Sequence, residues 1–269
     1  MKKQKYLTNA NMLAAIHESK MSFCSVLSSE YSDYDLITHD IFGITFDVIE
    51  QGRAIRANRI NNEKIKSIAK EQDITTKKAK EFCEENNLLI SVADIYPSEV
   101  VVRVMTNEHI PDVIDKKGET VKAKTNFKPF KHYVMWDDGE LVEVARSHWK
   151  GTFDDGTFCT NHGKLTDELG KIIIKFTERY SYKANFRGYS YLDDMVGDAR
   201  LVLTMKALLF DESIQTVQLN PFAYYTSIVN NAFRAVLNTE KYHRNIRDKL
   251  LVQSGFDPSF NRQLEDSND

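Results

Sequence analysis

The chain reads Asn220-Pro-Phe-Ala-Tyr-Tyr-Thr-Ser-Ile-Val-Asn-Asn-Ala-Phe-Arg-Ala-Val-Leu-Asn238 and, shortly afterwards, Lys241-Tyr-His-Arg-Asn-Ile-Arg247. Apolar side chains recur there at steps of three and four, at Phe222, Tyr225, Val229, Ala232 and Val236. Polar side chains recur at the same steps on another face, at Ser227, Asn231, Arg234, Asn238, Lys241 and Asn245, with Tyr224 at the head. This spacing predicts one amphipathic helix. We expect Asn220 to be its N-cap and Pro221 its first residue.

The polar face of this helix combines hydroxyl, amide and cationic groups, which are the groups that bind base edges and phosphates. An ordinary solvated helix face explains the polarity but not the scarcity of acids. From residue 220 to residue 250 the only carboxylates are Glu240 and Asp248. The cations are Arg234, Lys241, Arg244, Arg247 and Lys249, so five minus two gives a net charge of plus three. We interpret this face as a nucleic-acid-binding surface.

The whole chain, in contrast, is slightly acidic, with 269 residues, 42% apolar residues and a formal net charge of −3. Sequence-independent affinity for nucleic acid comes from cations that neutralise phosphates, so we expect DNA contact to be local and assisted. No window approaches the roughly 18 uninterrupted apolar residues of a membrane helix, and the N-terminus lacks the apolar core of a signal peptide. We therefore expect an intracellular protein that does not bind membranes.

Cysteines and histidines give little indication of a metal site. Cys24, Cys83 and Cys159 are odd in number and far apart, which predicts reduced thiols. Cys159, His162 and His148 suggest zinc ligation only if a fourth ligand is supplied from elsewhere. We expect no metal and no cofactor, and no nucleotide-binding or catalytic motif is visible.

The pattern predicts a mainly α protein with an N-terminal α+β extension that contains a small antiparallel sheet. We expect a helical segment at 1–89, a β-rich insertion at 90–162, a helical bundle at 163–251 and an acidic tail at 252–269. The bundle should contain two further helices, one marked by Leu165, Leu169, Ile172, Phe176 and Tyr180, and one marked by Leu192, Met195, Ala199, Val202 and Leu209. Gly188 should break the chain between them.

Two other local signals stand out in the first 160 residues. Helices at 62–72 and 75–87, joined at Gln72-Asp73-Ile74, could form a helix-turn-helix or only a solvated amphipathic pair. Alternation around Asp138-Gly139 predicts a β-hairpin, preceded by a strand at 100–105 and followed by a second turn at Asp155-Gly156.

Residues 163–251 resemble region 2 of bacterial sigma factors, and specifically the late-transcription sigma factors of T-even-like bacteriophages. The matching segments are Asn185-Phe-Arg-Gly-Tyr-Ser-Tyr-Leu-Asp-Asp-Met195, Leu209-Phe-Asp-Glu-Ser213 and Asn220-Pro-Phe-Ala-Tyr-Tyr-Thr226, in that order. Tyr6-Leu-Thr-Asn-Ala-Asn-Met-Leu-Ala-Ala-Ile16 is similar to the N-terminal helix of that family. Segments at 104–111, 130–133 and 145–151 are similar to the longer versions in phages of marine bacteria.

The resemblance implies a non-enzymatic specificity factor in the cytoplasm of an infected bacterium. Its contacts with the clamp helices of the RNA polymerase β′ subunit would fall at Asp194, Asp198, Arg200 and Thr204. The next helix would hold the non-template strand of an AT-rich minus-ten promoter element, through Tyr224, Tyr225, Ser227, Asn231, Arg234, Asn238, Lys241 and Arg244. The family recruits the phage sliding clamp through a C-terminal segment, for which Phe260 and Leu264 are the candidates here. Ile228 and Val229 replace the paired tryptophans of primary sigma factors, which implies help from a coactivator.

Several alternatives stay open at this point. Phe222 and Tyr225 suit a protein core as well as base stacking, the polymerase-contact positions suit a solvated helix face, and the C-terminal segment suits a frayed tail. A free DNA-binding regulator that uses residues 62–87 is the main alternative function. A nucleic-acid-processing enzyme would need a cluster of acids around a metal, and no such spacing is visible.

Overall fold

The computed structural model describes residues 7–136, 138–214 and 219–259. The chain divides into two compact units. One, the helical unit, comprises the described residues of 1–16, 165–210 and 218–269, and the other, the sheet unit, comprises 17–164 and 211–217. α1 (Asn9–Met21) begins in the helical unit and ends in the sheet unit. No helix in the described ranges combines the length and the apolar character needed to cross a membrane.

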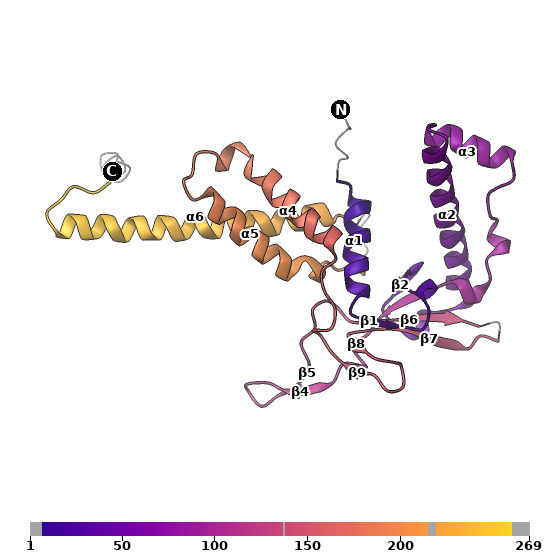
Figure 1. Ribbon diagram of the computed structural model, residues 1–269. Coiled ribbons are helices and arrows are strands. Elements are labelled where there is room, and N and C mark those ends of the chain that lie inside the picture. Colours follow the sequence, from indigo (N-terminus) through magenta and orange to yellow (C-terminus); the bar gives the residue numbers. More distant parts are fainter. Residues whose placement is uncertain (1–6, 137, 215–218, 260–269) are drawn as a thin grey trace. The chain divides into compact units, whose positions relative to one another are not determined.

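Three helices pack together in the helical unit, as the apolar patterns predict: α4 (Asp167–Ser181), α5 (Leu192–Lys206) and α6 (Pro221–Gln253) (Figure 1). The predicted start of α6 is confirmed, because the Asn220 side chain accepts a hydrogen bond from the N–H of Ala223 at 3.0 Å and Pro221 is the first helical residue. Gly188 adopts a φ of +91° in the α4–α5 connection, a conformation that glycine permits without strain.

Aromatic rings fill the core of the helical unit. Phe233 of α6 meets Tyr180 of α4 and Phe186 of the α4–α5 connection edge-to-face, with ring centroids 5.3 and 4.8 Å apart. The Tyr180 hydroxyl donates to Asn230 Oδ1 at 3.0 Å, which satisfies a polar group at the edge of this core. Packing of these aromatic side chains therefore helps to hold the three helices together.

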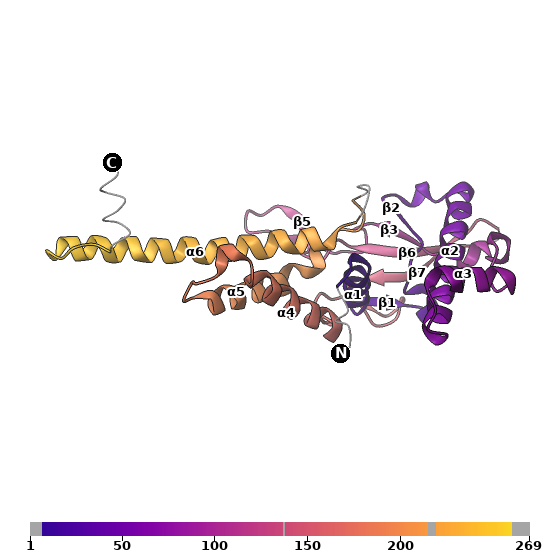
Figure 2. The same cartoon turned by 90° about the horizontal axis from the view of Figure 1, so that it is seen from above.

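Only the first half of α6 is buried by this packing. Beyond Phe233, Asp248 is the single buried residue of α6, and its carboxylate accepts hydrogen bonds from the N–H and hydroxyl of Ser259. Figures 1 and 2 show the second half of α6 extending past α4 and α5. Helix α6 thus presents a long surface that its own unit leaves uncovered.

A five-stranded sheet forms the centre of the sheet unit, in the order β1-β7-β6-β3-β2. Its strands are β1 (Cys24–Val26), β2 (Leu36–Thr38), β3 (Val102–Met105), β6 (Phe130–Met135) and β7 (Leu141–Ser147). The predicted Asp138-Gly139 hairpin joins β6 to β7, and Gly139 adopts a φ of +85°. This part of the expectation is confirmed.

The prediction of a purely antiparallel sheet confined to residues 90–162 is wrong. β2 pairs with β3 in parallel, and both β1 and β2 come from the segment predicted to be helical. Three-residue strands are too short to show alternation, and a parallel pair requires a crossover that links distant residues. The sequence pattern also missed the hairpin β4 (Asp112–Ile114) and β5 (Thr120–Lys122), whereas the turn at Asp155-Gly156 does join β8 (Trp149–Lys150) to β9 (Thr157–Phe158).

The crossover between β2 and β3 contains α2 (Phe46–Glu71) and α3 (Thr76–Glu85). The predicted helix pair is confirmed, because Ile65, Ala79 and Cys83 form a buried cluster between the two helices. However, α2 begins at Phe46, capped by Thr45, and not near Asn62. The first turns of α2 pack on the sheet through Ile49 and Ala57, so tertiary contacts continue the helix where the sequence signal was weak.

A buried ionic group ties the connection after α5 to the sheet unit. Glu212 Oε2 lies 2.8 Å from Lys20 Nζ and 3.4 Å from Arg103 Nη1. The Arg103 side chain is fully buried between the rings of Tyr34 and Phe130, 3.9 and 3.8 Å from their centroids. Burial lowers the pKa of Lys20, whereas the Glu212 carboxylate raises it. Charges buried this deeply must keep their partners, so Glu212 fixes this connection in place.

Gly52 is the point at which α2 approaches the sheet most closely. A Cβ at this position would lie 2.4 Å from Val100 Cγ1 and 3.1 Å from Leu36 Cδ1. Both neighbours belong to the core around the sheet. A side chain at position 52 would therefore push α2 away from the sheet.

We predict that Gly52→Ala lowers the free energy of unfolding of the sheet unit by about 1–3 kcal/mol through overpacking. Urea unfolding followed by tryptophan fluorescence measures this, because Trp136 and Trp149 both lie in the sheet unit. Gly43→Ala is the matched control, since a Cβ at position 43 meets no atom within 4 Å. Equal stability of the two variants would contradict the close approach.

Candidate nucleic-acid interface

The predicted polar stripe of α6 is exposed along its whole length. Ser227, Asn231, Arg234, Asn238, Lys241 and Asn245 are all exposed. At 3.6 residues per turn, their positions fall within about 80° of one another around the helix axis. Among the described residues, no hydrogen bond or ion pair engages Arg234 or Lys241. The six side chains therefore form one continuous polar surface, called the α6 stripe below.

Packing on the opposite side of α6 sets the direction of this stripe. Tyr225, Val229 and Phe233 are completely buried, and Ile228 is nearly so. Phe222, the first member of the predicted apolar face, lies at its edge, 47% exposed but with its ring 5.0 Å from that of Phe176. The apolar face anchors the helix at one rotation, and that rotation turns the α6 stripe to solvent.

The expectation that Tyr225 stacks on a base is contradicted by its burial. Its side chain is 0% exposed, and its hydroxyl donates to the carbonyl oxygen of Ala207 at 3.3 Å. The spacing of the sequence was equally consistent with a core position and a stacking role for Tyr225. The packing of its ring against α4 and α5 shows that Tyr225 is a core residue. Tyr225 is therefore not a candidate for contact with nucleic acid.

Tyr224 is only partly available. Its hydroxyl donates to the carbonyl oxygen of Lys206 at 3.1 Å, its ring centroid lies 5.5 Å from that of Phe210, and burial raises its pKa. One face of the ring is thus engaged by the end of α5. Tyr224 stays a candidate for stacking through its remaining surface.

Two further aromatic positions near α6 were not singled out from the sequence. Tyr242 is 64% exposed on α6, and Tyr189, 40% exposed, pairs with Tyr191 at a centroid distance of 5.3 Å. The pKa of Tyr191 is raised by burial first and by Tyr189 and Glu240, and lowered by Arg244, so these α6 side chains lie near the tyrosine pair. Arg244 is half-buried and lies off the α6 stripe, next to these rings.

Ile228 and Val229, which the resemblance noted in the sequence would align with the paired tryptophans of primary sigma factors, lie in the core of the helical unit. Side chains at these positions face α4 and α5, so they do not form an exposed wedge. The site therefore offers partial aromatic surfaces and a polar stripe, without an exposed ring at positions 228 and 229.

A second surface lies on α5. Asp194, Asp198 and Thr204 are exposed, as predicted. On the same side of α5, Leu201 is 62% exposed and Met205 is 71% exposed. These two apolar residues were missed because they lie outside the apolar stripe of the helix, although their spacing of four was visible in the sequence. We call Asp194, Asp198, Leu201, Thr204 and Met205 the α5 face.

Arg200 does not belong to the α5 face. Its guanidinium donates to Glu178 Oε1 at 2.8 Å and to Thr177 Oγ1 at 3.3 Å, both on α4. Position 200 points about 120° away from position 194 on an ideal helix. The expectation that Arg200 contacts a partner is therefore replaced by a role in the α4–α5 contact.

The remaining predicted positions, Phe260 and Leu264, lie outside the described residues. The described chain turns back after α6, with Ser259 bonded to Asp248. A contact between this C-terminal segment and a sliding clamp stays a prediction.

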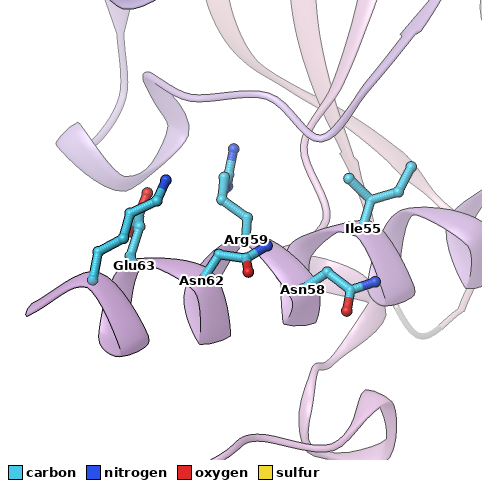
Figure 3. A pocket seen from close by; sticks show the side chains of 6 residues that line it. Ile55, Asn58, Arg59, Asn62 and Glu63 are labelled. Atoms are coloured by element: carbon cyan, nitrogen blue, oxygen red, sulfur yellow. The ribbon is translucent and has the colours of Figure 1, made fainter. Parts of the chain in front are cut away.

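Helix α2 carries the polar groove shown in Figure 3. The groove has a volume of about 400 Å³ and is lined by Ile55, Asn58, Arg59, Asn62, Glu63 and Lys66. The guanidinium of Arg59 is engaged within the protein, because it pairs with Asp35 at 2.9 Å and donates to the Tyr34 carbonyl oxygen. On α3, Lys77, Lys78 and Lys80 are balanced by Glu81, Glu84 and Glu85. This balance leaves α3 without a net charge, so it attracts phosphates less than α6 does.

Metal-binding groups do not gather in the described parts of the chain: no three His, Cys, Asp or Glu residues there are placed to hold an ion. His148 is buried with a φ of +54°, and burial lowers its pKa to about 3, with further lowering from His109 and His162. Cys159 meets His148 through a backbone hydrogen bond of 2.8 Å. These residues are parts of the packed sheet unit.

Comparisons with known proteins found no matching protein-family model, no similar curated protein and no similar solved structure. Evidence for a function therefore comes from the surfaces of α5 and α6 themselves.

We predict that Tyr225→Ala destabilises the helical unit by about 3–5 kcal/mol, the usual loss for a large buried aromatic side chain. Tyr224→Ala should cost clearly less, because that side chain is only partly buried. Thermal unfolding monitored by far-ultraviolet circular dichroism measures both losses. A Tyr225→Ala protein as stable as wild type would return Tyr225 to the candidate DNA contacts.

Proposed function

We propose that this chain is a sigma-like transcription specificity factor, which binds a bacterial RNA polymerase through α5 and a separated promoter strand through α6. The observation that carries the proposal is the α6 stripe: six exposed polar side chains in a row on a helix with a net charge of plus three. Carboxylates are tolerated on a helix face that contacts only water. On a helix face that lies along phosphates they are unfavourable, because like charges repel.

The α5 face supports the protein-binding half of the proposal. Two exposed large apolar side chains next to Asp194 and Asp198 combine an apolar contact area with a negative charge that suits a cationic protein surface. Helices α5 and α6 pack against each other. A factor with both surfaces on adjacent helices couples polymerase binding to DNA binding through a single bundle.

The energetics favour assisted rather than autonomous promoter opening. Extruding a base costs a few kcal/mol, and stacking on an aromatic side chain returns about 1–3 kcal/mol. Burial of Tyr225 and the apolar residues at 228 and 229 leave few rings to recover that cost. We therefore propose that polymerase and a coactivator complete the opening, with the phage sliding clamp as the expected coactivator and Phe260 and Leu264 as its contacts. Such a factor would act in the host cytoplasm without enzymatic activity of its own.

A free DNA-binding regulator is the alternative that the α2–α3 helix pair keeps open. Duplex binding without polymerase discriminates between the two functions, because a regulator retains it and a specificity factor of net charge −3 does not.

We predict that Arg234→Ala and Lys241→Ala each lower the yield of open complex at a late promoter. Each substitution removes a contact to a base edge or a phosphate, which should weaken the binding free energy by about 1–3 kcal/mol. Permanganate footprinting of unpaired thymines measures the yield, and gel filtration with core polymerase checks that the complex still forms.

Arg247→Ala is the matched control on the same helix. Arg247 is exposed and cationic but lies about 140° around the axis from Arg234. Its loss should leave the footprint unchanged. Equal effects of all three substitutions would reduce the α6 stripe to a general charge effect and would refute its role as a binding face.

We also predict that Leu201→Ala combined with Met205→Ala lowers affinity for core polymerase at least about tenfold, because both side chains are exposed and available for burial in a partner. Asp198→Ala should add to the loss. Competition against the primary sigma factor measures these affinities. Unchanged affinity in the double variant, with α-helical content intact, would contradict docking through the α5 face.

A further inference from the structure

Three large aromatic side chains of the sheet unit are exposed to water. Phe42 is 87% exposed, Phe46 62% and Trp136 52%. Phe42 and Phe46 belong to the segment that leads into α2, and Trp136 follows β6 in the β6–β7 hairpin. Rings of this size are normally covered, and surface phenylalanine or tryptophan in a group marks a binding surface.

The Phe46 ring lies against the hairpin turn that follows Trp136. A Cβ at Gly139 would lie 3.4 Å from Phe46 Cζ, so the Phe46 ring rests on the turn. The Gly139 N–H donates to the Trp136 carbonyl oxygen at 2.8 Å within the same turn. Next to the exposed Phe42, Ile41 packs against the sheet core, and Asp40 Oδ1 accepts a hydrogen bond from the Phe42 N–H at 3.0 Å.

A cavity of about 390 Å³ lies beside Trp136 and is lined by Trp136, Asp138, Glu140 and Val142. It combines an indole ring with two carboxylates. An aromatic face attracts cations through its quadrupole, and carboxylates form charge-assisted hydrogen bonds with ammonium and guanidinium groups. The lining therefore suits the side chain of a lysine or an arginine.

The two chain segments that carry the patch contain carboxylates but neither lysine nor arginine. Residues 40–52 contain Asp40, Asp47 and Glu50 and neither lysine nor arginine, and residues 138–142 contain Asp138 and Glu140, again without lysine or arginine. Glu50 is the one member with a described cationic partner, Arg53. Carboxylates in this arrangement repel phosphates, so nucleic acid is a poor occupant and a cationic protein segment is a good one.

We infer that this aromatic–acidic patch, made of Phe42, Phe46, Trp136, Asp138 and Glu140, binds a basic segment of a partner protein. Apolar side chains of the partner cover Phe42 and Phe46, and a lysine or arginine enters the cavity beside Trp136. Aromatic side chains bury about 150–250 Å² each when covered, so three partly exposed rings supply a few hundred Å² towards the roughly 800 Å² per partner of a standard interface. This inference does not depend on the α5 and α6 surfaces.

The test uses the full-length chain and a synthetic peptide that alternates arginine and leucine. In a Trp149→Phe background Trp136 is the remaining tryptophan of the chain, so its fluorescence reports on the cavity. We expect the peptide to shift and quench this fluorescence, and we expect a peptide with glutamate in place of arginine to leave it unchanged. Asp138→Asn with Glu140→Gln, or Phe42→Ala alone, should weaken binding at least about tenfold.

Two matched controls separate the patch from general attraction. Asp154→Asn with Asp155→Asn removes two exposed acids elsewhere in the sheet unit, and Ile114→Ala removes a side chain that is 77% exposed. Both variants should bind the peptide like wild type. Equal weakening in the controls, or equal binding of the glutamate peptide, would overturn the inference.

A second measurement needs no substitution. Hydroxyl-radical oxidation of wild-type protein should modify Trp136 and Phe42, and the arginine peptide should protect both. Absence of protection at saturating peptide would also overturn the inference.

A separate outcome concerns self-association. If the chain forms a concentration-dependent dimer that Phe42→Ala dissociates, the occupant of the patch is a second copy of the chain, and the inference is overturned.

Discussion

The seating of the first half of α6 against α4 and α5 is the contact on which the functional account depends. Tyr225, Val229 and Phe233 are completely buried there, and edge-to-face rings from α4 and the α4–α5 connection surround Phe233. Because α6 continues as a single helix to Gln253, this packing also fixes the direction of residues that make no core contact. The α6 stripe thus owes its orientation to buried rings on the opposite side of the helix.

Charge is distributed unevenly between the surfaces of the chain. The α6 helix is cationic, whereas the α5 face and the aromatic–acidic patch of the sheet unit carry exposed carboxylates next to apolar side chains. Such a distribution suits a chain with one nucleic-acid contact and separate protein contacts, because like charges exclude the wrong partner from each surface. With a net charge of −3, the proposed DNA contact would depend on the proposed protein contacts.

The sequence predicted the helical unit well and the sheet unit partly. Long helices leave a periodic signal, and Asn220, Pro221 and Gly188 mark their limits, so α4, α5 and α6 were predictable. The strands β1 and β2 were not, since three residues cannot show alternation and the parallel β2–β3 pair joins residues far apart in the chain. Within the site, spacing identified the exposed α6 stripe. Spacing put Tyr225 on the apolar face and Tyr224 at the head of the polar face, but it left a stacking role for Tyr225 open. It also could not show that Arg200 pairs with Glu178, because both outcomes depend on neighbouring helices.

Site-specific photo-crosslinking in a complex of the chain, core polymerase and promoter DNA tests the central claim most directly. A photoreactive amino acid at Asn231 or at Asn238 should attach to the non-template strand within the opened promoter, whereas the same group at Arg247, on the opposite side of α6, should not. Crosslinks from Asn231 and Asn238 only to protein, or equal DNA crosslinks from all three positions, would contradict the assignment of the α6 stripe as the surface that holds the separated strand.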